Sequence, residues 1–201
     1  MLRCFSLYSI FRNMKKEFSR PTKFVQNSIP LKGTFMITIN CSLDNITQDN
    51  YDNIVNNLSL NSLSCPKCSH ADFVVHGYYS RSLKTPAGII TLKILRVRCR
   101  ACGSTHAVLL SSIVPYSTVP LYAHIIITSG GDYDQLMNDV HSIDESNISY
   151  IRRMFNSFWK QKLLSENIFF DDLLSFNCFS LFHRQFMQIK CTSNILFSPS
   201  T

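Results

Sequence analysis

Residues 96–106 read RVRCRACGSTH, and the earlier stretch 65–70 reads CPKCSH. A C-x-x-C turn directs two sulfurs to one point, so two such turns can complete a tetrahedron around a metal ion. Gly103 follows the second pair, where the turn needs a residue that tolerates positive φ, and Ser69 holds the matching place after the first. The spacing therefore predicts one structural Zn²⁺ ion held by Cys65, Cys68, Cys99 and Cys102.

Two other uses of the thiols stay open from the spacing alone. The first alternative is a redox C-x-x-C motif. Such a motif needs only one pair, whereas this sequence has two, and it usually lies at a helix start after a βαβ pattern, which is not present here. Unliganded cysteines buried in a core are the second alternative. Because four thiolates close a zinc site, the expected ion has no open position for catalysis. His70, His76 and His106 lie near the pairs in sequence and are expected at the surface or beside a ligand, not on the metal.

The stretch that contains the two pairs has the composition of β-strands. FVVHGYYS (73–80) and IITLKILRVR (89–98) are β-branched and aromatic runs, separated by a turn at KTPAG (84–88). HAVLL (106–110) follows as a third strand. We therefore expect a small three-stranded antiparallel zinc ribbon over 65–116, stabilised largely by its metal.

Helical periodicity dominates on both sides of this ribbon. The lead-in over 36–64 combines a strand start in MITINCSLDN with an amphipathic helix over 46–61. Beyond Pro115, helices are expected over 118–131, 132–140 and 143–164, the last with a capping box of Ser142 and Glu145. The fold class is thus α+β, with a helix-turn-helix-like unit over 117–164. An apolar helix and tail over 165–201 and a poorly ordered extension over 1–35 complete the chain.

The charge balance favours a polyanionic partner. The chain has 201 residues, with 20 Lys+Arg against 13 Asp+Glu and a net charge of +7. This suits DNA, although a merely basic protein is the alternative. A helix needs about 18–20 consecutive apolar residues to span a bilayer, and the sequence contains no such run. The N-terminus lacks the pattern of a secretory signal. With its scattered cysteines, the sequence predicts a cytoplasmic protein with no membrane partner.

Basic residues concentrate between the cysteine pairs. Arg96, Arg98 and Arg100 alternate with Val97 and Cys99, so in a strand they share a face at a spacing that suits phosphates. The alternative is that they offset the negative charge of a four-thiolate metal site. The residues expected to contact phosphate are Arg81, Lys84, Lys93, Arg96, Arg98 and Arg100.

The helices over 132–140 and 143–164 have the proportions of a helix-turn-helix, with the second as recognition helix. Its expected base-reading residues are Asn147, Ser149, Tyr150, Arg152 and Arg153. Plain packing of two amphipathic helices is the alternative, because the first helix carries the acids Asp132, Asp134 and Asp139.

The motifs CPKC, HGYYSR and RVRCRACG, followed by an apolar stretch that closes on PY at 115–116, resemble the N-terminal zinc ribbon of bacterial transposases. They resemble most a bacterial domain-of-unknown-function family related to that ribbon. The resemblance covers 65–116, and 117–164 more weakly. It implies metal and DNA binding, with the four cysteines as ligands.

The chain departs from those transposases after the helical unit. They continue into a catalytic domain with an Asp-Asp-Glu set for Mg²⁺, whereas this sequence ends at residue 201 and its last acids, Glu166, Asp171 and Asp172, are close neighbours. We therefore expect no transposition chemistry, no other enzyme activity and no small-molecule substrate.

The sequence thus predicts a non-enzymatic, zinc- and DNA-binding protein. Its rivals are an inactive transposase remnant and a zinc-stapled protein-interaction adaptor. In the adaptor, C-terminal phenylalanines would dock a partner or a second copy, whereas core packing is the other explanation for these rings. They are Phe169, Phe170, Phe176, Phe179, Phe182 and Phe186.

Overall fold

The computed structural model describes residues 36–39, 46–168, 170, 174–182 and 184–188. All of these lie in one of the chain's two compact units, residues 31–201. The expected extension over 1–35 lies outside the described residues.

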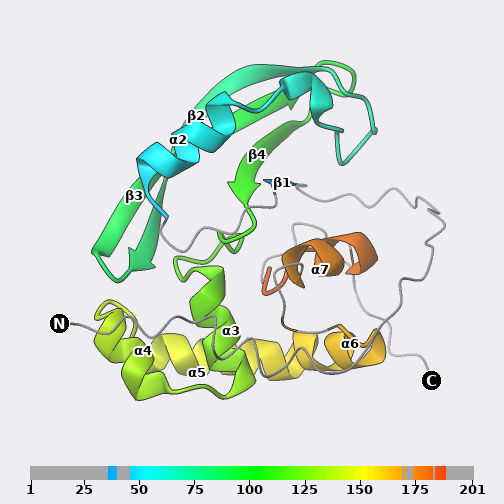
Figure 1. The fold of residues 1–201 in the computed structure, drawn as a ribbon. Coiled ribbons are helices and arrows are strands. Elements are labelled where there is room, and N and C mark those ends of the chain that lie inside the picture. The colour runs from blue at the N-terminus through cyan, green and yellow to red at the C-terminus, as the bar shows by residue number, and fades with distance from the viewer. Residues whose placement is uncertain (1–35, 40–45, 169, 171–173, 183, 189–201) are drawn as a thin grey trace. The chain divides into compact units, whose positions relative to one another are not determined.

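The sheet has four strands, in the order β1-β4-β3-β2 (Figure 1). Strands β2 (Phe73–Thr85), β3 (Gly88–Cys99) and β4 (Thr105–Leu110) are antiparallel neighbours. Strand β1 (Ile37–Ile39) adds to β4 in parallel. The α+β class is therefore right, but the expected three-stranded antiparallel ribbon is wrong. The reason is that Val108, Leu109 and Leu110 are all fully buried, so the outer edge of β4 needs a backbone partner, and β1 supplies it.

A long hairpin, β2–β3, forms most of the sheet. Its register runs from Phe73 opposite Cys99 to Thr85 opposite Gly88. Pro86 occupies the first central position of the connecting turn, where its fixed φ is favourable. One bulge interrupts the ladder between Val75 and Gly77, and the positive φ of Gly77 (137°) accommodates it. Bulges of this kind generally increase the local twist of a hairpin.

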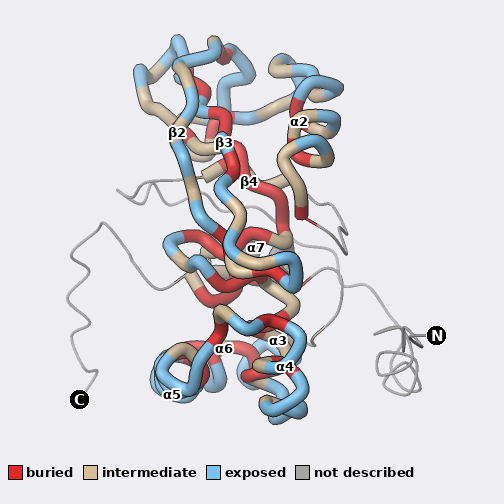
Figure 2. The backbone as a smooth tube through the Cα atoms, turned by 90° about the vertical axis from the view of Figure 1, so that its left-hand side faces the viewer, coloured by how far each residue is buried: buried red, intermediate tan, exposed pale blue. Residues whose placement is uncertain are grey.

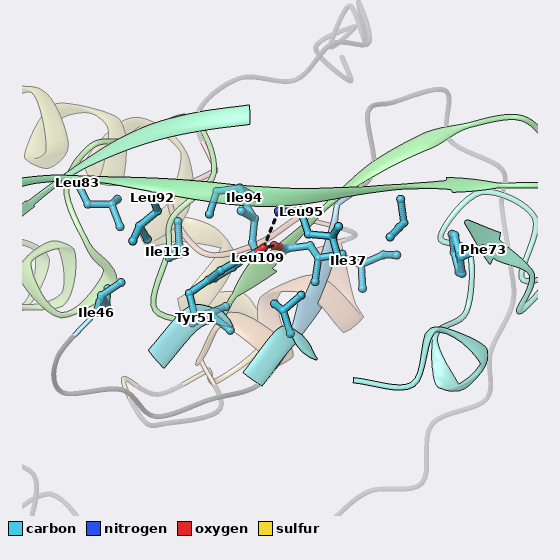
Figure 3. Close-up of a cluster of buried hydrophobic side chains, with 14 of the residues drawn as sticks. Ile37, Ile46, Tyr51, Phe73, Leu83, Leu92, Ile94, Leu95, Leu109 and Ile113 are labelled. Carbon is cyan, nitrogen blue, oxygen red and sulfur yellow. Dashed lines mark hydrogen bonds between the residues drawn. The ribbon is translucent and has the colours of Figure 1, made fainter. Parts of the chain in front are cut away.

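Helix α2 (Gln48–Asn56) packs against the sheet, and its Tyr51 lies beside Leu95 of β3 (Figure 3). Strands β3 and β4 pair only over Arg96–Arg98 of β3, so earlier β3 backbone groups need other partners. The Tyr51 hydroxyl accepts from Leu95 N (2.8 Å) and donates to the Val108 carbonyl (2.9 Å). The Gln48 side chain accepts from Lys93 N (2.7 Å).

The helix expected over 46–61 is shorter than predicted. It begins after Thr47, whose side chain accepts from Asn50 N, and ends at Asn56. The Asn57 side chain donates to the Asn53 carbonyl (2.7 Å), the kind of side-chain bond that competes with helix propagation. A single 3-10 turn, Leu60–Ser62, follows.

The helical unit begins with α3 (Leu121–Ser129) and α4 (Tyr133–Asp139). Helix α5 (Glu145–Met154) continues through a π-helical turn (Phe155–Trp159) into α6 (Lys160–Ser165), and α7 (Leu174–Phe182) follows. Gly130 ends α3 with a left-handed φ of 78°, as its position predicts.

The capping box of α5 differs from the expected one. Asp144, not Ser142, is the N-cap: its carboxylate accepts from Asn147 N (2.8 Å), and Asn147 Oδ1 accepts from Asp144 N. An aspartate is among the best caps and its charge suits a helix N-terminus, so it displaces the serine two residues earlier.

Two hydrophobic clusters organise these elements (Figure 2). The first joins the sheet to α2, with Tyr51, Leu92 and Leu109 fully or almost fully buried. The second joins the helices around Trp159 and Phe186. Each cluster is built from consecutive chain segments, so sheet and helical unit each have their own core.

The described aromatic rings of the C-terminal segment pack within this second core. Trp159 contacts Phe182 and Phe186 at centroid separations of 6.1 and 5.7 Å, and Phe170 contacts Phe155 at 6.1 Å. The expected apolar helix exists as α7. Phe169 and the side chains of Phe176 and Phe179 lie outside the described residues.

Candidate metal centre and basic surfaces

Two turns of the same construction carry the four cysteines. In the first, Ser69 N donates to the Cys65 carbonyl (2.8 Å). In the second, Gly103 N donates to the Cys99 carbonyl (2.9 Å). Ser69 and Gly103 have positive φ values of 62° and 70°, so the equivalence expected between these two positions is confirmed. The second turn follows β3 directly, and Phe73, at the start of β2, lies opposite Cys99. The hairpin ladder therefore brings the two turns together.

The four sulfurs converge on one point. All four Sγ atoms lie within 4.8 Å of one another. The Cys65–Cys102 and Cys68–Cys99 separations are 3.7 and 3.6 Å, far longer than the about 2.05 Å of a disulfide bond. Cys65 and Cys99 are buried, whereas Cys68 and Cys102 are half-buried. These four residues can hold a metal ion, as their spacing predicts.

The environments of the sulfurs differ. Burial raises the pKa of the Cys65 thiol to about 12. Hydrogen bonds from the side chain and backbone of Ser104 lower the pKa of Cys102 to about 6. Because the thiolate is the metal-binding form, a cation that binds here must displace a proton from Cys65, and its charge compensates the buried thiolate.

One of the three neighbouring histidines reaches a sulfur. His106, at the second position of β4, is only 2% exposed, and its Nε2 lies 3.3 Å from Cys65 Sγ. The imidazole ring of His106 makes an edge-to-face contact with the Phe73 ring, with a centroid separation of 6.0 Å and an interplanar angle of 84°. His70 and His76 are exposed, and His70 Nδ1 lies near the Cys68 carbonyl instead (2.9 Å). Sequence alone did not separate His106 from the other two, because each lies within a few residues of a cysteine pair or of the bulge.

Four of the residues expected to contact phosphate are exposed: three lie on β3 and the fourth follows its last residue. These residues are Lys93, Arg96, Arg98 and Arg100. Arg96 and Arg98 stand opposite Ala107 and Thr105 of β4. Arg100 Nε lies 3.9 Å from Asp72 Oδ1, and both side chains are more than half exposed. Such a contact is strongly screened by solvent, so it leaves the Arg100 charge largely available to a partner.

The other expected phosphate contacts bind within the protein. The Arg81 guanidinium donates to the backbone carbonyls of Val114 and Ser117, the latter at 2.8 Å. Lys84 Nζ donates to the Ser142 carbonyl and to Asn147 Oδ1 (2.6 Å). Both side chains thus attach β2 to the helical unit. Asn147, expected to read bases, is half-buried and serves as Lys84's acceptor and as part of the α5 capping box.

The remaining base-reading candidates lie on the exposed side of α5. These are Ser149, Tyr150, Arg152 and Arg153. Arg153 lies over the Tyr150 ring and Arg152 over the Tyr133 ring, each at 5.5 Å. On α4, Asp132 caps the helix by accepting from Gln135 N (2.9 Å), and Asp139 accepts from the Gln135 side chain (2.8 Å). Two of the acids that oppose DNA binding therefore have structural partners.

Residues 65–153 match a family described as a domain of unknown function, DUF6431. The match begins at the first metal-site cysteine and includes both turns, the hairpin and helices α3 to α5. Comparison with curated proteins gives no match, and comparison with solved structures gives none either. Among the helices of the described residues, none is long and apolar enough to cross a membrane.

Proposed function

We propose that this chain, with its domain of unknown function over 65–153, is a zinc-stapled, non-enzymatic DNA-binding protein related to the N-terminal region of transposases. Zn²⁺ holds the two cysteine turns together. The exposed cations of β3 contact backbone phosphates, and α5 contacts bases. A cytoplasmic location suits these roles, because reducing conditions keep the four thiols available to the metal.

The observation that carries the proposal is the sulfur geometry. Tetrahedral Zn²⁺ with bonds of about 2.3 Å requires sulfur–sulfur edges of about 3.8 Å. The Cys65–Cys102 and Cys68–Cys99 separations of 3.7 and 3.6 Å are close to that length. Four thiolates favour zinc or iron over harder cations, and they leave no site for substrate. The ion therefore acts as a structural link, in keeping with a non-enzymatic protein.

Support for DNA binding comes from the exposed charges. Arg96 and Arg98 are two residues apart on one strand and both are exposed, so their guanidiniums can reach neighbouring phosphates. Arg152 and Arg153 extend the positive charge onto α5. We assign Arg81, Lys84 and Asn147 a different role, since their internal hydrogen bonds hold the hairpin against the helical unit.

Elemental analysis of the purified protein tests the metal. We expect one zinc per chain and negligible iron. Replacing Cys99, which is buried, with serine should abolish this stoichiometry. A wild-type protein that is folded and free of zinc would contradict the proposal.

Fluorescence anisotropy with a labelled mixed-sequence duplex tests DNA binding. Each phosphate contact contributes about 0.9 to the slope of log affinity against log salt, so Arg96→Ala/Arg98→Ala should lower the slope by about 2. Arg96→Lys/Arg98→Lys keeps both charges and should keep the slope. Absence of binding at low salt refutes the DNA-binding proposal, and salt-independent binding refutes the assigned phosphate contacts.

A further inference from the structure

We infer that His106 is a positioning residue of the metal centre, which donates its Nε2–H to the metal-bound thiolate of Cys65. This inference rests on the proposed zinc site and assigns one of its outer partners. With this hydrogen bond, the Cys65 sulfur accepts from a side chain of β4 as well as from backbone N–H groups of its own turn.

The geometry identifies the donor. Nε2 and Sγ are 3.3 Å apart, and both residues are buried, at 2% and 1% exposure. A thiolate that binds a metal has no proton to give, so the hydrogen of this contact belongs to the imidazole. A His106 ring with a proton on Nε2 is therefore the form that fits.

The charge of the site explains why such a donor is needed. Four thiolates around a divalent cation carry a net charge of −2, and burial of uncompensated charge is costly. The backbone N–H groups of Lys67 and Cys68 already hydrogen-bond to Cys65. Because Cys65 is the more buried member of its pair, water cannot supply a further donor, and His106 takes that place.

The position of His106 also links two parts of the fold. It lies on β4 opposite Val97 of β3, whereas Cys65 lies in the turn before β2. The contact of its ring with Phe73 fixes its orientation. The hydrogen bond therefore attaches the first cysteine turn to β4, in addition to the link that the metal provides.

The four cysteine sulfurs all lie within 4.8 Å of one another, and His106 is not part of that group. It is thus placed to orient a ligand without replacing one. Outer partners of this kind typically change metal affinity by about 10–100-fold when removed.

Zn²⁺ affinity of the full chain, measured by competition with a chromophoric chelator, tests the inference. His106→Phe keeps a ring against Phe73 but removes the donor, and we expect its affinity to fall about 10–100-fold. His106→Gln keeps an N–H donor and should lose less. His70→Phe removes an exposed histidine from the same cysteine turn and should stay within about twofold. An affinity of His106→Phe within twofold of wild type overturns the inference.

Two spectroscopic readouts separate positioning from simple packing. Long-range ¹H–¹⁵N correlation of the zinc-loaded protein should show the His106 proton on Nε2, and a proton on Nδ1 overturns the inference. Cobalt-loaded wild-type protein should show the absorption of four thiolates, and His106→Phe should keep that ligand set with shifted thiolate-to-cobalt bands. A three-sulfur, one-nitrogen spectrum in wild type would make His106 a ligand and overturn the positioning role.

The outcomes also separate this inference from the proposed function. If wild-type protein binds neither zinc nor cobalt, the proposed metal site fails. If it binds both and the His106 variants match it, only the inference fails. If His106→Phe does not fold, His106→Gln and the tautomer measurement still decide.

Discussion

Lys84 and Asn147 are 63 residues apart in sequence, yet Lys84 Nζ donates to Asn147 Oδ1 at 2.6 Å. The lysine lies one residue before the end of β2, and the asparagine lies in the first turn of α5. The same ammonium also donates to the Ser142 carbonyl in the α4–α5 connection. One side chain thus attaches the tip of the hairpin to the start of the proposed recognition helix.

Removing this contact should destabilise the protein. Lys84→Met removes one donor from the Ser142 carbonyl and one from Asn147 Oδ1, so we expect a loss of about 1–3 kcal/mol in the free energy of unfolding. Urea unfolding of the zinc-loaded protein measures it. Lys93→Met, an exposed lysine of the same hairpin, should change stability by less than about 0.5 kcal/mol.

A double-mutant cycle isolates the direct pair. Lys84→Met, Asn147→Ala and the double variant should show a coupling energy of about 0.5–3 kcal/mol. Strictly additive losses would show that the two side chains act independently.

Tyr51→Phe should cost more than the loss of one surface hydroxyl. The Tyr51 hydroxyl serves Leu95 N and the Val108 carbonyl at the gap between β3 and β4, and the side chain is fully buried. Removal of the hydroxyl leaves the Leu95 N–H and the Val108 carbonyl without this hydrogen-bond partner, so we expect about 2–4 kcal/mol of destabilisation in urea unfolding. Tyr78→Phe removes a hydroxyl from a residue that is 60% exposed and should be nearly neutral. Equal effects of the two substitutions would exclude the bridging role.

Metal removal should affect the sheet before the helices. The first cysteine turn precedes β2 and the second connects β3 to β4, whereas the helical unit has its own core around Trp159. With a chelator present, we expect amide hydrogen exchange to accelerate most in 65–110 and least in α3 and α5. Uniform protection across the chain after chelation would show that the metal does not stabilise the sheet.

Stability should fall with acidity through His124. This residue of α3 is fully buried, and burial lowers its pKa from 6.5 to about 3. Below pH 6.5 His124 binds a proton in the unfolded chain but stays neutral in the folded chain. The free energy of unfolding therefore decreases as the pH falls towards 3. The contribution is about 1.4 kcal/mol per pH unit once the unfolded imidazole is charged.

Comparison of wild type with His124→Gln between pH 7 and 5 measures this effect. The variant lacks the titrating group but retains the zinc site, so the difference between the two curves removes the acid sensitivity of the thiolates. The wild-type curve should be steeper in this range. Parallel curves would show that His124 does not titrate differently in the two states.

Much of the fold follows from local patterns. Runs of β-branched and aromatic residues predicted β2, β3 and β4, and the glycines after Ser129 predicted the C-terminal end of α3, although the helix begins three residues later than expected. The convergence of Cys65, Cys68, Cys99 and Cys102 also follows from the chain, because a hairpin between two C-x-x-C turns must return the second to the first. These features depend on spacing and backbone preference, which a single sequence displays.

The other features depend on which surfaces meet. Short β1 joins β4 because a buried edge requires backbone partners, and nothing in residues 37–39 names that edge. Arg81 and Lys84 look like phosphate contacts in sequence, yet they bond to carbonyls more than thirty residues away. His106 differs from His70 and His76 in its burial and in the Cys65 sulfur that its ring reaches. Hydrogen bonding and burial are properties of the packed chain, so charge and spacing identify the candidates and three-dimensional contacts assign their roles.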